Sequence, residues 1–168
     1  QGVVTYNGDK QENNIVLTID PTTGNAAMQN ESGVSVMFDS YTIYSESGAL
    51  LANWESLEDQ GVTGGTWLEA NPSTHRVSEV MSQGETTLDL NEGFFLDGLF
   101  NTGGTQDLTF QFLIAGTTTI FDGVLQYGDL PTNVLDPDSP DLNEADFNRD
   151  GVVDRDDYLA WQTGFGTQ

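Results

Sequence analysis

The chain has 168 residues and no cysteine, and its 27 Asp and Glu against 4 Lys and Arg give a formal net charge of −23. A surface this acidic excludes nucleic acid and anionic membranes as partners, and it favours solubility and the binding of cations. Hydrophobic residues make up 36% of the chain, which is enough for a folded core, and no apolar run is long enough to span a membrane.

The first residues, QGVVTYNG, begin without a methionine. We interpret them as the start of a mature secreted chain from which a signal peptide has been removed, which predicts an extracellular or cell-surface location. Residues 1–11 also have the character of a strand-forming arm. Two placements remain open: the arm is the first edge strand of its own domain, or it adds a strand to the open sheet edge of a neighbouring copy.

Alternation of apolar and polar residues predicts β-strands up to about residue 130. The clearest strands are 14–20, 34–45 (with a kink after Phe38) and 107–115, and shorter candidates are 2–6, 86–90, 94–100 and 117–127. Turn sequences rich in Gly, Asn and Ser separate them. The inward-facing residues are expected to be Ile15, Leu17, Ile19, Val34, Val36, Phe38, Tyr41, Ile43, Leu108, Phe110, Phe112 and Ile114.

This pattern of short strands, without a convincing long amphipathic helix, predicts an all-β fold. We expect an immunoglobulin-like or jelly-roll-like β-sandwich over residues 1–130. Residues 131–138 contain Pro131 and Pro137 and a rise in Asp, and they are predicted to be a linker. Residues 139–168 are predicted to form a small helical calcium module.

The segment DFNRDGVVDRDD, residues 146–157, matches the EF-hand calcium loop. Such a loop needs oxygen ligands at positions 1, 3, 5, 7, 9 and 12, and glycine at position 6, where Gly151 stands here. Hard oxygen donors with no nearby Cys or His favour Ca²⁺ over zinc or copper. The predicted ligands are Asp146, Asn148, Asp150, the backbone carbonyl of Val152, Asp154 and Asp157.

The residues around this loop predict two helices. Ser139 followed by Pro140 is typical of a helix start, and apolar residues at helical spacing follow the loop. With the loop ligands, this stretch resembles the repeat of type I dockerins, calcium modules at the ends of secreted bacterial proteins. The resemblance implies a helix–loop–helix over residues 139–168 and docking to a cohesin-like protein. The apolar residues after the loop are Tyr158, Leu159, Trp161 and Phe165.

Three features depart from the dockerin pattern. The chain carries one such loop where the family carries two, and position 12 is Asp157 instead of Glu. The shorter side chain of Asp157 leaves magnesium as a competitor, although calcium is favoured. Loop positions 10 and 11, which often hold small hydroxyl residues that contact cohesin, are Arg155 and Asp156. Within the sandwich, residues 40–61 are similar to lamin-tail-like and other immunoglobulin-like sandwiches, which implies a β-sandwich without naming a ligand.

Other candidate sites within residues 1–130 have simpler explanations. Trp54 and Trp67 would stack on sugars if exposed, as in carbohydrate-binding modules, or would cap the ends of the core with their N–H groups near the surface. The lone His75 and the sequon at Asn30 are assigned no function. Carboxylates abound, but no nucleophile elbow, metal-protease motif or phosphate loop appears, so we expect no enzyme. The carboxylate groupings considered are Glu55 with Glu58 and Asp59, and Glu69 with Glu79.

Three functions follow from these observations. The first is an extracellular structural protein that binds calcium and self-assembles into a fibre or surface layer, with other copies of the chain as its partners. The second is a dockerin-type subunit that anchors the sandwich to a cohesin-like secreted protein. The third is a carbohydrate-binding module that takes a polysaccharide.

Overall fold

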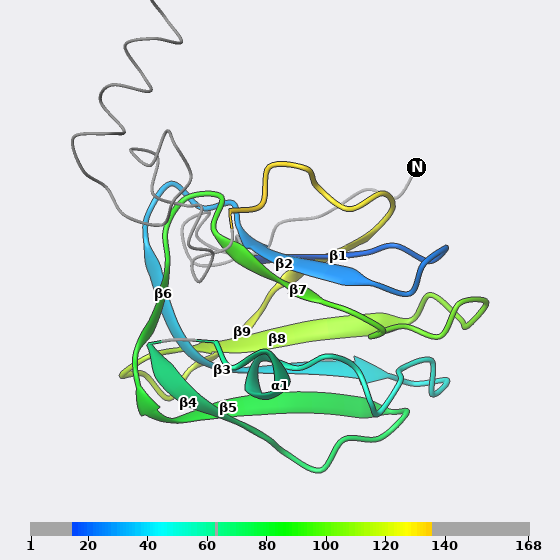
Figure 1. Cartoon of the computed structure of the whole chain (residues 1–168), viewed down its shortest axis with the longest axis horizontal. Coiled ribbons are helices and arrows are strands. Elements are labelled where there is room, and N and C mark those ends of the chain that lie inside the picture. Colours follow the sequence, from blue (N-terminus) through cyan, green and yellow to red (C-terminus); the bar gives the residue numbers. More distant parts are fainter. Residues whose placement is uncertain (1–14, 63, 136–168) are drawn as a thin grey trace, which may run out of the picture.

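The computed structural model describes residues 15–62 and 64–135, which form two β-sheets stacked on one another (Figure 1). The four-stranded sheet has the order β10-β1-β2-β7, with β1 Ile15–Ile19, β2 Ala26–Asn30, β7 Gly93–Leu96 and β10 Val124–Tyr127. The second sheet has the order β4-β5-β3-β8-β9, with β6 paired to β3, and contains β3 Val36–Ser45, β4 Gly65–Glu69, β5 Arg76–Gly84, β6 Thr86–Leu88, β8 Leu108–Ile114 and β9 Ile120–Asp122.

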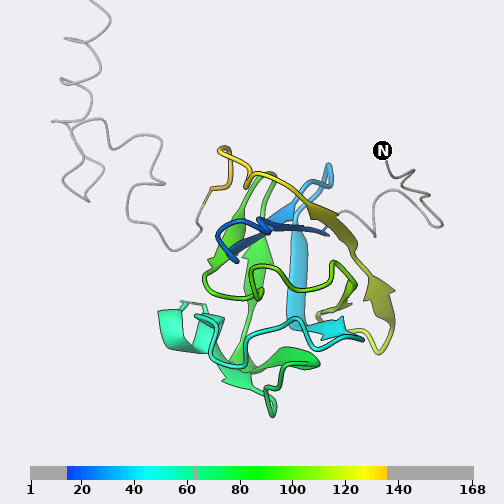
Figure 2. The same cartoon turned by 90° about the vertical axis from the view of Figure 1, so that its right-hand side faces the viewer.

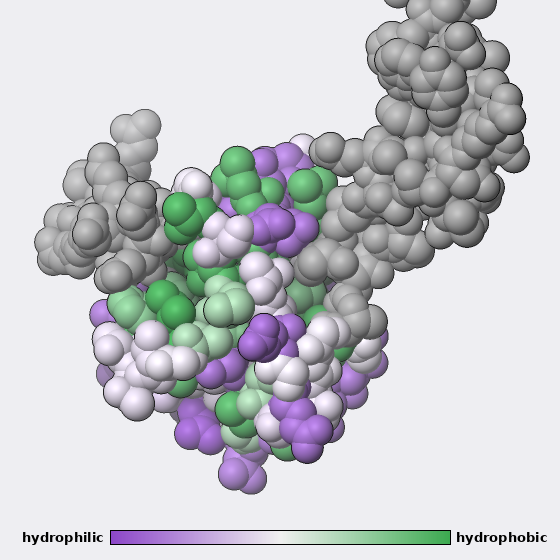
Figure 3. Space-filling view, turned by 90° about the vertical axis from the view of Figure 1, so that its left-hand side faces the viewer, coloured by the Kyte–Doolittle hydropathy of each residue, from purple (hydrophilic) through white to green (hydrophobic). Residues whose placement is uncertain are grey.

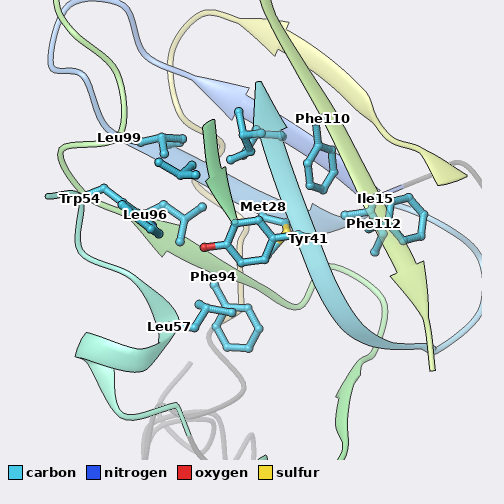
Figure 4. Close-up of a cluster of buried hydrophobic side chains, with 14 of the residues drawn as sticks. Ile15, Met28, Tyr41, Trp54, Leu57, Phe94, Leu96, Leu99, Phe110 and Phe112 are labelled. Carbon is cyan, nitrogen blue, oxygen red and sulfur yellow. The ribbon is translucent and has the colours of Figure 1, made fainter. Parts of the chain in front are cut away.

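Apolar side chains from the two sheets fill one continuous core, because alternate residues of each strand point inward. The all-β prediction is therefore confirmed for the described residues. Figure 4 shows the centre of this core, where Tyr41 and Phe110 from the larger sheet approach Met28, Phe94 and Leu96 from the smaller one. The chain passes from one sheet to the other at Gly123, between β9 and β10 (Figure 2).

Strand β1 lies between β2 and β10 and pairs with them in opposite senses. It runs antiparallel to β2 and parallel to β10, with Val16 opposite Val124 and Ile19 opposite Tyr127. The remaining strand pairs of both sheets are antiparallel. The first and last described strands thus lie side by side in the same direction.

The kink predicted in the long strand 34–45 is present in β3. The register with β8 shifts between Phe38 and Ser40, and there β3 changes from pairing with β6 to pairing with β5. The inward assignment of Val34 was wrong. This residue precedes the strand and is 43% exposed, because its neighbours Asn30 and Ser32 bind its carbonyl and hold it in a turn.

Four elements were not predicted from the pattern: β2, β4, β5 and the short helix α1, Leu57–Gln60. Helix α1 begins after Ser56, whose side chain accepts a hydrogen bond from the Asp59 backbone N–H, and ends at Gly61 in the left-handed conformation, φ 66°. It lies against β4 (Figure 1), and its only buried residue, Leu57, joins the core (Figure 4).

Several predictions fall outside the described residues. These include the arm 1–11, the strand 2–6 and the calcium module 139–168. Of the predicted linker 131–138, residues 131–135 are described, and Leu135 pairs in parallel beside β7, donating to the Asn91 carbonyl and accepting from the Gly93 N–H. Among the described residues, no helix is both long and apolar enough to cross a membrane.

Candidate functional site

The six predicted calcium ligands all lie outside the described residues: Asp146, Asn148, Asp150, Val152, Asp154 and Asp157. Within residues 15–62 and 64–135, no group of three or more His, Asp or Glu side chains is placed to hold a metal ion.

The two tryptophans considered for sugar stacking are core residues. Trp54 is 1% exposed and Trp67 is 3% exposed, so neither presents a ring face to solvent. Trp67 packs against Phe38 and Tyr41, with ring centroids 5.3 and 6.3 Å apart respectively. The indole N–H groups of Trp54 and Trp67 were expected near the surface, but both are buried without a hydrogen-bond partner. These two residues cannot stack on a sugar in this conformation.

A buried carboxylate, Glu79 of β5, is the centre of a hydrogen-bond cluster. One of its oxygens accepts from the Tyr41 hydroxyl and from the Leu57 N–H at 2.9 Å, and the other accepts from the Glu58 N–H at 2.8 Å. Glu79 is 0% exposed, and the Tyr41 ring that reaches it is among the core side chains in Figure 4. The cluster joins β3, β5 and the first turn of α1.

Burial dominates the acid–base properties of this cluster. It raises the pKa of the Glu79 carboxyl above its ordinary value, although the hydrogen bonds from Tyr41, Leu57 and Glu58 act in the opposite direction. Burial also raises the pKa of the Tyr41 hydroxyl well above its usual range, and the nearby Glu79 charge adds to this. The hydroxyl therefore keeps its proton and remains a hydrogen-bond donor at neutral pH.

One of the carboxylate groupings considered above, Glu69 with Glu79, is brought together by the pairing of β4 with β5, where the two residues are directly opposite. Glu69 also contributes to the raised pKa of Glu79. A glycosidase pair needs a cleft that admits the sugar. Glu79 is instead enclosed, with both oxygens occupied, and Glu58 is turned to the Glu69 backbone N–H at 2.7 Å. The arrangement stabilises the loop before β4.

His75 and the sequon also have structural roles. His75 Nδ1 lies 3.1 Å from the Ser45 carbonyl, in the turn before β5. The Asn30 side chain is fully buried and donates to the Leu88 carbonyl at 2.8 Å and the Val34 carbonyl at 2.9 Å. An oligosaccharide could not be attached to that amide without opening the fold.

Sequence reasoning missed a row of side chains across the outer face of the larger sheet. Register places these residues side by side from β4 to β9, and we call them the outer row: Leu68, Val80, Ser40, Leu113 and Ile120. Three of them are well exposed, with Leu68 at 42%, Val80 at 44% and Ile120 at 67%. Each interrupts the polar side of its own strand, so the row exists only in the assembled sheet.

Two further rows lie beside the outer row on β5, β3 and β8. The nearer row is Ser78, Thr42 and Gln111, and the farther one is Arg76, Tyr44 and Thr109. A shallow cavity of about 170 Å³ lies over this face, and its lining includes Thr42, Tyr44, Gln111 and Ile120. These rows carry no carboxylate on the three central strands, and Gln111 binds Asp122 on the edge strand β9 at 2.8 Å.

On the face shown in Figure 3, apolar residues reach the surface at several places between hydrophilic ones. The sheet face described above differs because its apolar residues are aligned across strands and its centre lacks acidic residues.

Comparisons with known proteins give little for this chain. No family model matches the sequence, and no curated protein matches it. Two solved structures of a GH20 exo β-N-acetylglucosaminidase from Vibrio harveyi, an inactive mutant and a complex with N-acetylglucosamine, align at 8% and 9% identity with a TM-score of 0.33. The alignment covers 71% of this chain and 18% of the enzyme. A TM-score this low establishes no shared fold, and we transfer no property of the enzyme.

Proposed function

We propose that this chain is a secreted, non-enzymatic structural protein, in which an immunoglobulin-like or jelly-roll-like sandwich is joined to an EF-hand-type calcium module. Calcium orders the module, and the ordered module and the N-terminal arm are where copies of the chain meet. The product of this assembly is a fibre or a layer outside the cell. The sandwich acts as the building block, and the cation controls whether blocks join.

The single observation that carries this proposal is the register of residues 146–157. An oxygen ligand stands at each of the six positions that an EF-hand loop uses, and glycine stands at the turn position. A run of acidic residues without a site has no reason to place a glycine at the turn position of the loop, where Gly151 stands. The registered spacing favours a calcium site over a solvated acidic tail.

The solitary loop supports a role in assembly. EF-hand loops ordinarily work in pairs, and residues 1–168 contain one. In this proposal the pairing surface of the module contacts another copy of the chain and not its own sandwich. A contact between unlike surfaces of successive copies propagates into a filament if the rotation does not close a ring. The net charge of −23 opposes such contact, and a bound cation offsets part of the repulsion.

The architecture of the sandwich is compatible with a scaffold. Its buried carboxylate Glu79 and its indoles Trp54 and Trp67 are enclosed in the core. Glu79 holds the first turn of α1 against the sheet by accepting hydrogen bonds from the Leu57 and Glu58 N–H groups. These three enclosed residues therefore contribute to the stability of the sandwich.

Calorimetry tests the calcium site. Titration of the full chain should show one site, and Asp146→Ala or Asp150→Ala should remove it. Asp156→Ala is the matched control, because it removes one carboxylate at loop position 11 without removing a ligand. If all three variants lost calcium affinity equally, the loss would reflect the change in net charge and not the removal of a ligand. Unchanged binding in Asp146→Ala and Asp150→Ala would refute the site.

Light scattering and electron microscopy test assembly. The parent should form large particles with millimolar calcium and disperse in chelator. The dockerin resemblance of the loop, with Tyr158 and Leu159 after it, favours one second candidate, a docking subunit. A parent chain that binds calcium but stays small at all concentrations would reject self-assembly and favour docking to a cohesin-like protein.

A further inference from the structure

We propose that two copies of this chain dock through the outer faces of their six-stranded sheets to form a dimer that needs no calcium. The surface consists of the outer row and the two rows beside it, and the occupant is a second copy of the same face. This contact is distinct from the calcium-dependent contacts proposed above and does not depend on them. It would give a two-block unit from which larger assemblies grow.

Charge identifies the second copy as the occupant. Two chains of −23 repel each other wherever their carboxylates meet. The three rows on β5, β3 and β8 are free of carboxylates and carry Arg76, the only Lys or Arg between residues 15 and 135. Depletion of charge with retention of Arg and aromatic residues is typical of the centre of a protein interface, and Tyr44 stands next to Arg76 here.

The distribution of residues on this face is self-complementary. The four strands lie in the order β5-β3-β8-β9. Consider a two-fold axis that lies between the two facing sheets, runs parallel to the strands and passes over the gap between β3 and β8. This axis places β5 of one copy over β9 of the other, and β3 over β8. Val80 then faces Ile120 of the second copy, and Ser40 faces Leu113. Sheets pack face to face at about 10 Å, a spacing that such side chains fill.

The same axis pairs opposite charges. It places Arg76 on β5 near Asp122 on β9 of the second copy. The two residues are offset by one cross-strand row, which is about 7 Å along a strand. An extended arginine side chain covers that distance. In the single chain, one Arg76 nitrogen donates to the Ala70 carbonyl at 3.0 Å, which leaves other donors of the guanidinium free for a carboxylate. Two symmetrical ion pairs result.

Sedimentation velocity of the full chain in chelator tests the dimer. The parent should sediment as a concentration-dependent dimer, and Val80→Glu and Ile120→Glu should each weaken it by at least tenfold in Kd, because each buries a carboxylate against apolar residues. Leu90→Glu is the matched control: Leu90 is 54% exposed but lies outside the face, so this variant should dimerise like the parent.

A charge exchange tests the geometry. Arg76→Asp should weaken the dimer, and adding Asp122→Arg to the same chain should restore it, with thermal unfolding checked to show that every variant is folded. A parent that is monomeric in chelator, or a Val80→Glu variant with the parent's Kd, would overturn the proposal. Monomers that bind a neutral polysaccharide through this face would overturn it in favour of a sugar site. Assembly on adding calcium is scored separately, so either proposal can fail alone.

Discussion

The Tyr41 hydroxyl donates a hydrogen bond to the Glu79 carboxylate across two paired strands, and both residues are buried at the centre of the sandwich. This contact completes the set of hydrogen-bond donors around the Glu79 carboxylate, which is not exposed to solvent. The other donors are the backbone N–H groups of Leu57 and Glu58, which ordinarily remain unpaired at a helix start. The pair therefore joins the larger sheet to the only helix among the described residues.

Tyr41→Phe removes one donor from the buried carboxylate and should destabilise the fold. We expect a loss of about 1 to 3 kcal/mol in the free energy of unfolding, because a buried charged acceptor is left with one partner fewer. Urea unfolding followed by tryptophan fluorescence measures this, since Trp54 and Trp67 are buried.

Tyr44→Phe is the control for this substitution. It removes the same hydroxyl from the outer side of the same strand, where Tyr44 is 40% exposed. The control should unfold at the urea concentration of the parent. Equal destabilisation by both substitutions would contradict the role assigned to the pair.

Glu79 should make the stability of the parent fall as pH rises. Its pKa is raised in the folded state, so the folded chain holds this proton more tightly than the unfolded chain. The resulting stabilisation is complete below the ordinary pKa of 4.5 and is lost as pH rises through the folded pKa. Glu79→Gln cannot titrate, so the stability difference, parent minus variant, should shrink as pH increases from 4.5.

Urea unfolding at a series of pH values measures this difference. Taking the difference between parent and variant removes the contributions of Asp20 and Asp107, whose hydrogen-bonded carboxyls have lowered pKa values and change stability in the opposite direction. A difference that grows with pH would mean that the three donors outweigh burial at Glu79.

Gly93→Ala should weaken the pairing of β7 with β2. A methyl group there would overlap the Met28 carbonyl oxygen and lie 2.8 Å from the Gln29 Cα, so one strand must shift. Overpacking of this kind costs about 1 to 3 kcal/mol. Gly33→Ala is the control, because that position opens to empty space and its φ is not positive. Thermal unfolding should separate the two variants, and equal melting would argue against the close approach.

Trypsin should report calcium binding to the module. The chain has four cleavage sites, at Lys10, Arg76, Arg149 and Arg155, and the last two lie inside the loop 146–157. Calcium should slow cleavage at these two arginines, and chelator or Asp150→Ala should restore it while Arg76 in β5 stays uncut. An unrelated trypsin substrate added to the same digest is the control for trypsin activity with and without calcium. Calcium protection that persists in Asp150→Ala would place the cation elsewhere.

The strongly alternating strands were predictable from sequence. The strands β3 and β8 alternate between buried and more exposed residues, which gives a period of two in the sequence. In β1 all five residues are buried, and the alternate residues Ile15, Leu17 and Ile19 are the ones that join the core. The kink after Phe38 was also foreseen, because the alternation changes phase there, and the register shift confirms it. The two-sheet arrangement followed from the number and shortness of such strands.

Strands β2 and β5 were not predicted because their sequences lack a clear alternation of apolar and polar residues. All five residues of β2 are buried, including Gln29 and Asn30, whose amides bind backbone carbonyls, so no alternation marks it. In β5 an inward position is occupied by the charged Glu79, which is tolerated because of donors from distant segments. The outer row could not be seen either, since its members meet only through strand register.

The parallel pairing of β1 with β10 has a mechanical consequence. The residues before Ile15 leave from the start of one strand and those after Tyr127 leave from the end of its parallel neighbour, so the two exits lie at opposite ends of the pair. Tension between the exits acts along the strands and loads all four register pairs together, in shear, instead of peeling them apart in turn. A fibre of such blocks would resist stretching up to a threshold force and then yield one block at a time.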